Sequence, residues 1–217
     1  MEKNTVMTPN ERREKEREEV REKFLRAART VFLELGYAGT TMRKISLEAG
    51  YTTGALVHHF KDKDTLLMAL CAADFLSLRR EFDRISQIDN TLERLRELGR
   101  TYVEFAQKYP NHYKLMFMTE HPNPRIEERG IAKGDPDEDA YAFLRQAVEA
   151  ARAQGKFRPE YDDADLVAQV LWSGMHGIVA LEMTHGKDEW TAWRPINVRT
   201  NVMVEALLRG LTKPGED

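Results

Sequence analysis

The sequence predicts an all-α protein of about nine helices, divided into a small N-terminal domain and a larger C-terminal one. Three observations carry this prediction. Helix-start signals recur along the whole chain, apolar residues repeat at helical spacing, and β-branched runs and glycine clusters are sparse. Hydrophobic residues make up 41% of the 217 residues and charged residues 32%, which suits a real core surrounded by long, solvated helices.

The first predicted helix begins at residue 9 and ends at Gly36. The sequence T-P-N-E at 8–11 is a capping box, with Thr8 as the N-cap, proline at the first helical position and Glu11 reaching back to the cap. An apolar stripe runs over 24–35, whereas the residues before Phe24 have none. The first half is therefore predicted to be a solvated extension.

Three shorter signals follow. Helices are expected over about 41–49, ended by Gly50, and over about 53–60. A fourth helix is expected to begin after Asp62, which is suited to the N-cap.

The rest of the chain carries five further helix signals. Asn90 and Asp135 are expected to be N-caps, and prolines and glycines predict a loop over 119–136. The five helices are expected over about 91–109, 111–118, 136–155, 163–186 and 195–210.

Charge and composition exclude several classes of protein. Residues 1–63 hold 13 Lys and Arg against 10 Asp and Glu, whereas residues 64–217 hold 20 against 26. A mildly basic head on an acidic body permits nucleic-acid contact at one end, although ordinary solvated helix faces would explain so small a difference equally well. Cys71 is the only cysteine, the N-terminus is charged and no apolar run reaches membrane-spanning length, so a cytoplasmic protein without a membrane segment is expected.

Residues 41–60 have the layout of a helix-turn-helix. Two helices of roughly eight residues meet at Gly50, and Ile45, Ala49, Leu56 and Phe60 can face inward. The second helix presents small and hydroxyl-bearing residues, which let a backbone approach DNA bases in the major groove. The nearby lysines and arginines suit a polyanion.

The stretch from about Lys23 to Leu70 closely resembles the DNA-binding domain of TetR-type transcriptional regulators. The resemblance rests on Gly36–Tyr37 at the end of the first helix, Thr41 at the start of the second, the Ala49–Gly50 turn and the Phe60-x-x-Lys63 segment. It implies a helix-turn-helix domain over 1–66 and an effector-binding and dimerisation domain over 67–217. The residues it places at the DNA are Thr41, Arg43, Thr52, Thr53, Gly54, Ala55, Val57, His58, His59 and Lys63.

Two positions depart from the family pattern. The family often has an aromatic residue at the position of Val57, and its hydroxyl commonly touches a phosphate, so that contact is lost or replaced here. Thr52 stands where serine is common, which is a mild change. The DNA-binding role therefore carries over, but the individual contact at position 57 does not.

The C-terminal part resembles the TetR domains named for a Trp–His–Gly signature, here Trp172, His176 and Gly177. The resemblance implies a homodimer built from the last two helices, with interface candidates Gly174, Gly177, Val202, Leu207 and Leu208. It also implies a small, mostly apolar or aromatic effector. Candidate ligand contacts are Tyr102, Phe105, Tyr113, Phe117, Phe143, Trp172 and His176, although aromatic residues at helical spacing are more often core.

The favoured function is a repressor released from a palindromic operator by its effector. The alternative is a helical interaction module that keeps the fold but has lost specific DNA binding, which Val57 and the modest basicity motivate. Sequence motifs for a hydrolase, a nucleotide-binding loop or a metalloprotease are absent, so neither an enzyme, a cofactor nor a bound metal is expected. The operator, the regulated genes, the effector and the sign of regulation are left open by the residues.

Overall fold

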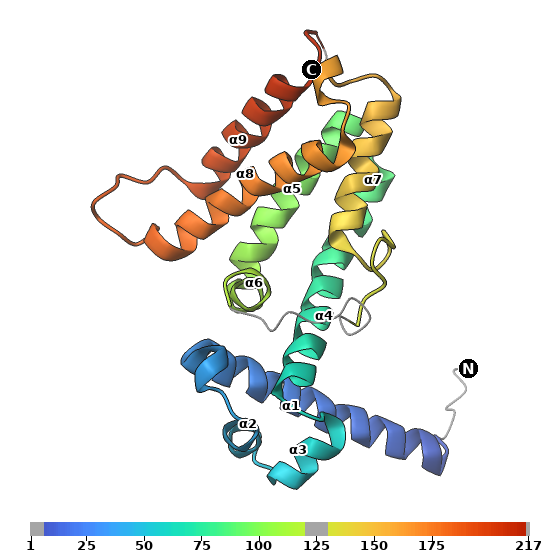
Figure 1. Cartoon of the computed structure of the whole chain (residues 1–217), viewed down its shortest axis with the longest axis vertical. Coiled ribbons are helices and arrows are strands. Elements are labelled where there is room, and N and C mark those ends of the chain that lie inside the picture. The colour runs from blue at the N-terminus through green and yellow to red at the C-terminus, as the bar shows by residue number, and fades with distance from the viewer. Residues whose placement is uncertain (1–6, 120–129, 216–217) are drawn as a thin grey trace, which may run out of the picture. The chain divides into compact units, whose positions relative to one another are not determined.

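The computed structural model describes residues 7–119 and 130–215, which form nine α-helices and no strand (Figure 1). The all-helical prediction is thus confirmed over the described residues. The helices are α1 (Pro9–Gly39), α2 (Met42–Glu48), α3 (Thr53–His59), α4 (Lys63–Glu81), α5 (Thr91–Lys108), α6 (Pro110–Phe117), α7 (Ala140–Ala153), α8 (Ala164–His185) and α9 (Ile196–Leu211). Two short 3₁₀ helices, η1 (Asp83–Gln87) and η3 (Pro159–Tyr161), were not expected from the sequence.

The chain divides into two compact units. One comprises residues 1–72 and 114–130, and the other residues 73–113 and 131–217. A domain boundary was expected at residue 66, but this position lies inside the continuous helix α4. α4 therefore begins in the first unit and ends in the second.

Side-chain caps position the helices of the first unit. The Thr8 hydroxyl accepts from the Glu11 amide and the Glu11 carboxylate accepts from the Thr8 amide, so the capping box at the start of α1 is present. Gly36 interrupts the helical geometry of α1 with φ +67°, a backbone conformation that favours glycine. Gly50, with φ +74°, makes the turn between α2 and α3 in the same way.

The core of the first unit joins α1 to the helix-turn-helix. Phe24, Ile45 and Leu56 are fully buried, and Phe60 is nearly so. Because burying such a side chain contributes about 1.5–3 kcal/mol, these residues hold α3 in place against α1 and α2. Of the residues expected to face inward, Ile45, Leu56 and Phe60 are buried, whereas Ala49 is only half-buried.

The second unit is a bundle in which α5, α7, α8 and α9 pack against one another. Glycines allow the closest approaches. A Cβ on Gly99 of α5 would lie 2.8 Å from a methyl of Val204, and one on Gly174 of α8 would lie 2.5 Å from a methyl of Leu207. α8 and α9 thus run side by side at short distance.

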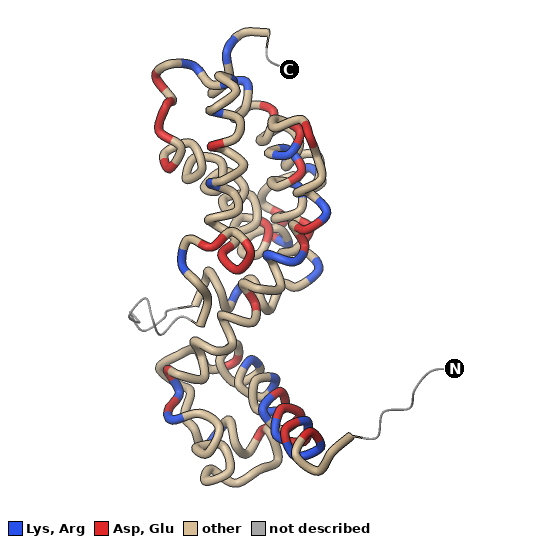
Figure 2. The backbone as a smooth tube through the Cα atoms, turned by 90° about the vertical axis from the view of Figure 1, so that its right-hand side faces the viewer, with Lys and Arg blue, Asp and Glu red and all other residues tan. Residues whose placement is uncertain are grey.

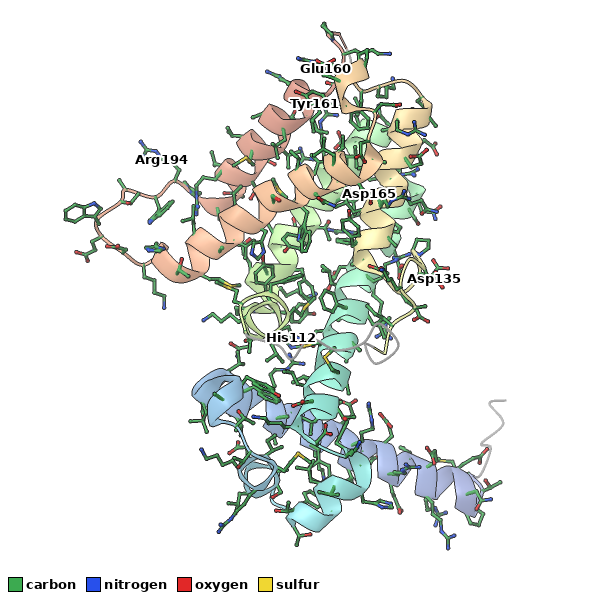
Figure 3. The ribbon with its side chains drawn as sticks, in the orientation of Figure 1. His112, Asp135, Glu160, Tyr161, Asp165 and Arg194 are labelled. Atoms are coloured by element: carbon green, nitrogen blue, oxygen red, sulfur yellow. The ribbon has the colours of Figure 1, made fainter. Side chains whose placement is uncertain are left out.

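The start of α7 differs from the prediction. Asp139, and not Asp135, is the N-cap, because its carboxylate accepts from the amides of Tyr141 and Ala142. Asp135 lies in the preceding turn (Figure 3), where its carboxylate accepts from the Asp137 amide. Both aspartates are favourable N-cap residues, and Asp139 is the one that directly precedes Ala140, the first residue of α7. Most of the predicted loop over 119–136 lies outside the described residues.

α8 is the most apolar helix of the second unit. Its 22 residues are long and apolar enough to cross a membrane by length and composition alone, with 33% of the most apolar window buried. Its packing against α5, α7 and α9 accounts for that apolar character as the central helix of a bundle. The remaining apolar surface on α8 faces outward.

Candidate functional site

The recognition helix α3 presents a face of small residues to solvent. Thr52, Gly54 and His58 are exposed, as is 48% of Val57. Leu56 points the other way and is completely buried. Since only one side chain on this face is larger than a valine, a duplex can approach the helix backbone closely.

Several hydroxyls expected at the DNA are already engaged by the protein. Thr41 and Thr52 act as N-caps, accepting from the amides of Lys44 and Ala55. The Thr53 hydroxyl lies 3.0 Å from the Ser46 hydroxyl and is partly buried. A hydroxyl that accepts from an amide still has its own O–H to donate, so Thr41 and Thr52 keep a hydrogen-bond donor.

The cations of the head differ in how they are held. The Lys63 ammonium donates to the Tyr37 carbonyl at 3.1 Å and lies 4.1 Å from the centre of the Tyr37 ring. These contacts hold the Lys63 ammonium at the end of α1. Arg43 of α2 and Lys61, which follows α3 in the chain, are both exposed.

The two adjacent histidines of α3 have different surroundings. Their rings are perpendicular, with centres 5.8 Å apart, and the His59 ring lies 5.4 Å from the Phe24 ring. Burial lowers the pKa of His59, and the charges of His58, Arg17 and Arg21 lower it further. His59 is thus a neutral, partly buried support, and His58 is the exposed member of the pair.

Four of the predicted ligand residues form one hydrogen-bonded cluster in the second unit, here called the aromatic cluster. They are Tyr102 of α5, Tyr113 of α6, and Trp172 and His176 of α8. The Trp172 indole donates to the Tyr102 hydroxyl at 3.0 Å, and that hydroxyl lies 2.9 Å from the Tyr113 hydroxyl. The Tyr113 hydroxyl lies 2.5 Å from Nδ1 of His176.

The order of protons follows from the tautomer of His176. When Nδ1 of His176 is unprotonated, Trp172 donates to Tyr102, Tyr102 to Tyr113, and Tyr113 to this nitrogen. Burial lowers the pKa of His176, which favours its neutral form, and raises the pKa of Tyr102 to about 12. Burial also raises the pKa of Tyr113. The cluster is therefore neutral at physiological pH.

The remaining predicted ligand residues lie elsewhere. Phe143 stacks on Phe82 with ring centres 5.8 Å apart, and the Arg79 guanidinium covers its other side at 4.2 Å. Phe105 is 2% exposed and packs on Tyr109. Phe117 is half-buried at the end of α6. Phe105 and Phe143 thus behave as core residues.

Sequence reasoning missed a hydrogen-bonded pair between α4 and α6. His112 Nδ1 lies 2.8 Å from the carboxylate of Asp74, whose side chain is 2% exposed. Figure 3 marks His112 on α6. An aspartate on the apolar face of α4 was a signal that could have indicated a buried partner.

The predicted dimer residues divide into two groups. Val202 is 64% exposed, and no atom lies within 4 Å of a Cβ placed on Gly177. Gly174 faces Leu207 within the protomer, and Leu208 is 2% exposed. Other large apolar residues accompany Val202 on the outside of α8 and α9, namely Leu166, Leu181 and Val198.

Two protein-family models match the chain. Residues 24–70 match the family model described as bacterial regulatory proteins, tetR family. Residues 95–213, more than half of the chain, match the model described as the tetracyclin repressor-like C-terminal domain.

Curated relatives agree with these matches. The repressor AcnR of Corynebacterium diphtheriae is 43% identical over 54 residues, which cover 25% of this chain and 28% of the relative. The chain thus spans less than a third of that relative's length. The repressor KstR2 of Mycolicibacterium smegmatis is 28% identical over 156 residues, which cover 70% of this chain and 73% of the relative.

Solved structures share the fold. SmeT, the repressor of the Stenotrophomonas maltophilia multidrug efflux pump SmeDEF, has a TM-score of 0.67 and 25% identity, covering 91% of this chain and 92% of SmeT. A protein from Rhodococcus sp. RHA1 has a TM-score of 0.70 and 23% identity, covering 98% of this chain and all of the other. The helix-turn-helix, the aromatic cluster and these matches lead to one assignment: the chain belongs to the TetR family of bacterial regulatory proteins.

Proposed function

We propose that this protein is a cytoplasmic, homodimeric transcriptional repressor that reads a near-palindromic operator and leaves it when a small effector binds. The observation that carries the proposal is the exposed small-residue face of α3, flanked by Arg43 and Lys61. An α-helix of this kind fits the major groove, and cations beside it fit the phosphates on either side. The relatives AcnR, KstR2 and SmeT are each described as repressors.

The dimer is proposed to form through the outer surface of α8 and α9. Leu181 and Val198 are 46% and 47% exposed in the protomer. Leu181 follows Gly177 by four residues on α8, and Val198 precedes the exposed Val202 by four residues on α9, so the members of each pair share a helix face. Exposed apolar surface of this kind is usual for an interface. Two copies related by a two-fold axis would present two α3 helices to an inverted repeat.

The effector is proposed to be mostly apolar or aromatic and to bind at the aromatic cluster. Trp172 is 36% exposed, so the cluster is open on the side of this indole. A structure of SmeT, similar to this chain at 22% identity, is described as a complex with triclosan. Because the four polar groups already bond one another, a ligand with one hydroxyl could replace a single link of the chain at small cost.

α4 is proposed to carry the effector signal to the head. The helix begins at Lys63 in the first unit. In the second unit, the Asp74–His112 pair joins it to α6. Tyr113 of the aromatic cluster immediately follows His112. An effector that moves α6 would therefore move α4, provided that it binds the two conformations with different affinity.

Selection of duplexes from a random DNA library tests the proposal, with purified protein at low and at moderate salt. The expected result is an enriched inverted repeat whose half-sites lie about one helical turn, or a related distance, apart. Salt-sensitive binding without an enriched motif would leave only a general polyanion contact. Absence of binding at both salts would favour the interaction module over the repressor.

A second experiment tests the coupling. A compound that raises the melting temperature of the protein is titrated by calorimetry with and without the selected duplex bound. The expected result is weaker binding to the DNA complex, since linkage requires that a ligand which weakens operator binding is itself weakened by operator. Equal affinity in the two titrations would overturn the proposed release mechanism.

A further inference from the structure

The first four turns of α1 precede the core of the first unit and have no apolar stripe of their own. α1 is nonetheless helical from Pro9, and its first buried residue is Phe24. Arg13, Arg17 and Arg21 follow one another at four-residue spacing, and Phe24 continues the same stripe three residues later. These three arginines, here called the arginine row, therefore extend the face of α1 that packs against the helix-turn-helix.

Contacts place the arginine row beside the recognition helix. The Arg21 guanidinium lies 5.3 Å from the centre of the Phe60 ring. Phe60 directly follows His59, the last residue of α3. Arg17 and Arg21 are both close enough to His59 to act on its charge. The row thus begins at the C-terminal end of α3 and runs away from it along α1 (Figure 1).

The charges of the row are only partly neutralised within the protein. Arg21 pairs with Glu18 at 3.3 Å, and both side chains are substantially exposed. Among the described residues, Arg13 and Arg17 form no ion pair within 4 Å, and both are exposed. An exposed ion pair such as Arg21–Glu18 is worth about 0–1 kcal/mol, so it can open at little cost.

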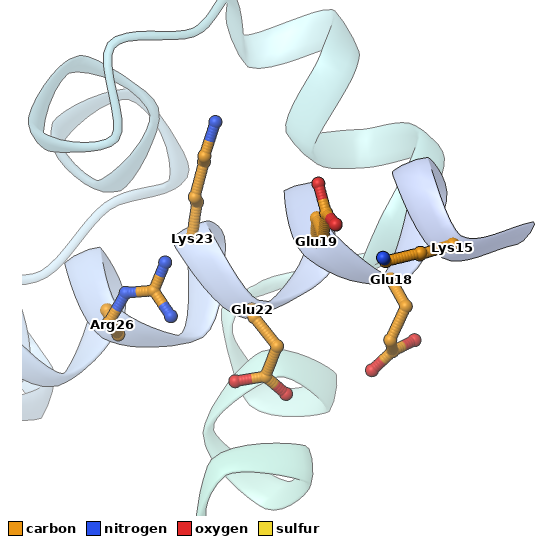
Figure 4. Close-up of a pocket in the computed structure, with 6 residues that line it drawn as sticks. All are labelled: Lys15, Glu18, Glu19, Glu22, Lys23 and Arg26. Carbon is orange, nitrogen blue, oxygen red and sulfur yellow. The ribbon is translucent and has the colours of Figure 1, made fainter. Parts of the chain in front are cut away.

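The other side of α1 is different. A shallow groove there is lined by three cations and three carboxylates, namely Lys15, Glu18, Glu19, Glu22, Lys23 and Arg26 (Figure 4). Such a surface is neutral as a whole and attracts no polyanion. Figure 2 shows both signs of charge along this helix. Glu18 joins the two faces, since it lines the groove and also pairs with Arg21, whereas Arg13 and Arg17 do not line the groove.

We infer that the arginine row is a second DNA-contacting surface, which binds phosphates of the duplex flanking the major groove that α3 enters. The inference rests on the proposed function, because it needs α3 to be in the groove. Arg13 to Arg21 spans about 12 Å at 1.5 Å per residue. A duplex strand carries a phosphate about every 3.4 Å of its axis, so a row of this length can meet more than one phosphate.

The chemistry of the row suits this role. Guanidinium groups bind phosphate oxygens through two parallel hydrogen bonds and remain charged at every physiological pH. Such contacts add affinity and fix orientation but read no bases. The row would therefore strengthen binding to operator and to unrelated duplex alike.

The test compares two double variants that lose the same charge from opposite sides of α1. R13A/R17A removes the two exposed arginines of the row that form no ion pair with another described residue. R12A/K15A removes two cations outside the row. Alanine favours helix, so both variants keep α1, which far-ultraviolet circular dichroism checks. Affinity for a mixed-sequence 40-base-pair duplex is measured at several salt concentrations.

For R13A/R17A, the slope of log affinity against log salt is expected to become shallower by about 1.8, or 0.9 for each lost phosphate contact. For R12A/K15A, a change below about 0.5 is expected. R13K/R17K, which keeps the charges, should recover most of the slope. Equal slopes for the two alanine variants would overturn the inference while leaving the proposed function intact, and a wild-type protein that binds no duplex would overturn both.

Discussion

The head and the body of this protein use polar side chains in opposite ways. On α3 and beside it, His58, Arg43 and Lys61 face solvent next to small residues. In the body, the four members of the aromatic cluster bond one another, and Asp74 is buried against His112. Polar groups facing outward are available to a partner without rearrangement, whereas polar groups that bond one another stabilise the bundle until a ligand replaces a bond.

This difference explains why the sequence predicts the partner of the head more fully than the effector of the body. DNA offers the same phosphates and groove to every member of the family, so the head needs a fixed geometry, which its caps and Gly50 provide. An effector has no such common shape. For the body we propose that the polar groups of the aromatic cluster distinguish one effector from another.

The largest expected effect is at Gly54. A Cβ at this position meets only the Thr52 hydroxyl, at 3.9 Å, so Gly54→Leu fits the free protein and should not lower its melting temperature. The leucine would hold α3 away from the base edges, and we expect a loss of about 100-fold or more in affinity for the selected duplex, from about 2–3 kcal/mol of lost contacts. Retained affinity with a retained fold would show that α3 does not enter the groove.

The next effect concerns the aromatic cluster. Tyr113→Phe removes the hydroxyl between Tyr102 and His176, and we expect it to lower the free energy of unfolding by about 1–3 kcal/mol because two hydrogen bonds of a fully buried side chain are lost. Tyr161→Phe, on the surface helix η3, is the control and should change stability little. Urea unfolding of both variants measures the difference, and equal stabilities would remove the structural role of the cluster.

The pair between α4 and α6 should contribute less. His112→Ala deprives the buried Asp74 carboxylate of one donor, and we expect a loss of about 1–2 kcal/mol in unfolding free energy. His112→Gln keeps a donor at this position and should lose less. If glutamine and alanine are equally destabilising, the hydrogen bond to Asp74 is not the source of the effect.

A pH series gives a smaller effect. The pKa of His176 lies below its ordinary value of 6.5, so below that pH the unfolded chain binds more protons than the folded one. The contribution of His176 to stability is therefore complete above pH 6.5 and declines as the pH falls further. His176→Gln should flatten the fall of melting temperature between about pH 7 and pH 5, and the matched His59→Gln variant reports the separate part due to His59.

The smallest expected effect is a gain. Val57 is 48% exposed on α3, where related proteins often carry an aromatic residue whose hydroxyl touches a phosphate. Val57→Tyr should strengthen binding to any duplex about fivefold, the value of one hydrogen bond of about 1 kcal/mol. Val57→Phe supplies the ring without the hydroxyl. A phenylalanine variant as tight as the tyrosine variant would assign the gain to packing instead.

Local signals predicted most of the fold and of the head. Thr8, Asp62 and Asn90 cap the helices that the sequence assigned to them, because a cap depends only on neighbours in the chain. The prediction that Asp135 is the N-cap of α7 was wrong for the same reason. Asp135 and Asp139 lie close in sequence and carry the same local signal.

Contacts distant in sequence were harder to predict. Nothing local distinguishes Phe143, which packs on Arg79 and Phe82, from Tyr102, which joins the aromatic cluster. The Asp74–His112 pair joins residues 38 positions apart, so the sequence offers both partners without pairing them. The engagement of Lys63 with the Tyr37 carbonyl likewise depends on how α1 ends.

The central claim is that α3 reads bases while the surrounding cations hold phosphates. The most direct test is the affinity of the wild-type protein for its selected duplex relative to a scrambled duplex of equal length, measured across a range of salt. We expect a ratio of about 1,000 or more at physiological salt, with both affinities falling as salt rises. A ratio near one at every salt concentration would contradict the account, because the head would then hold phosphates without reading bases.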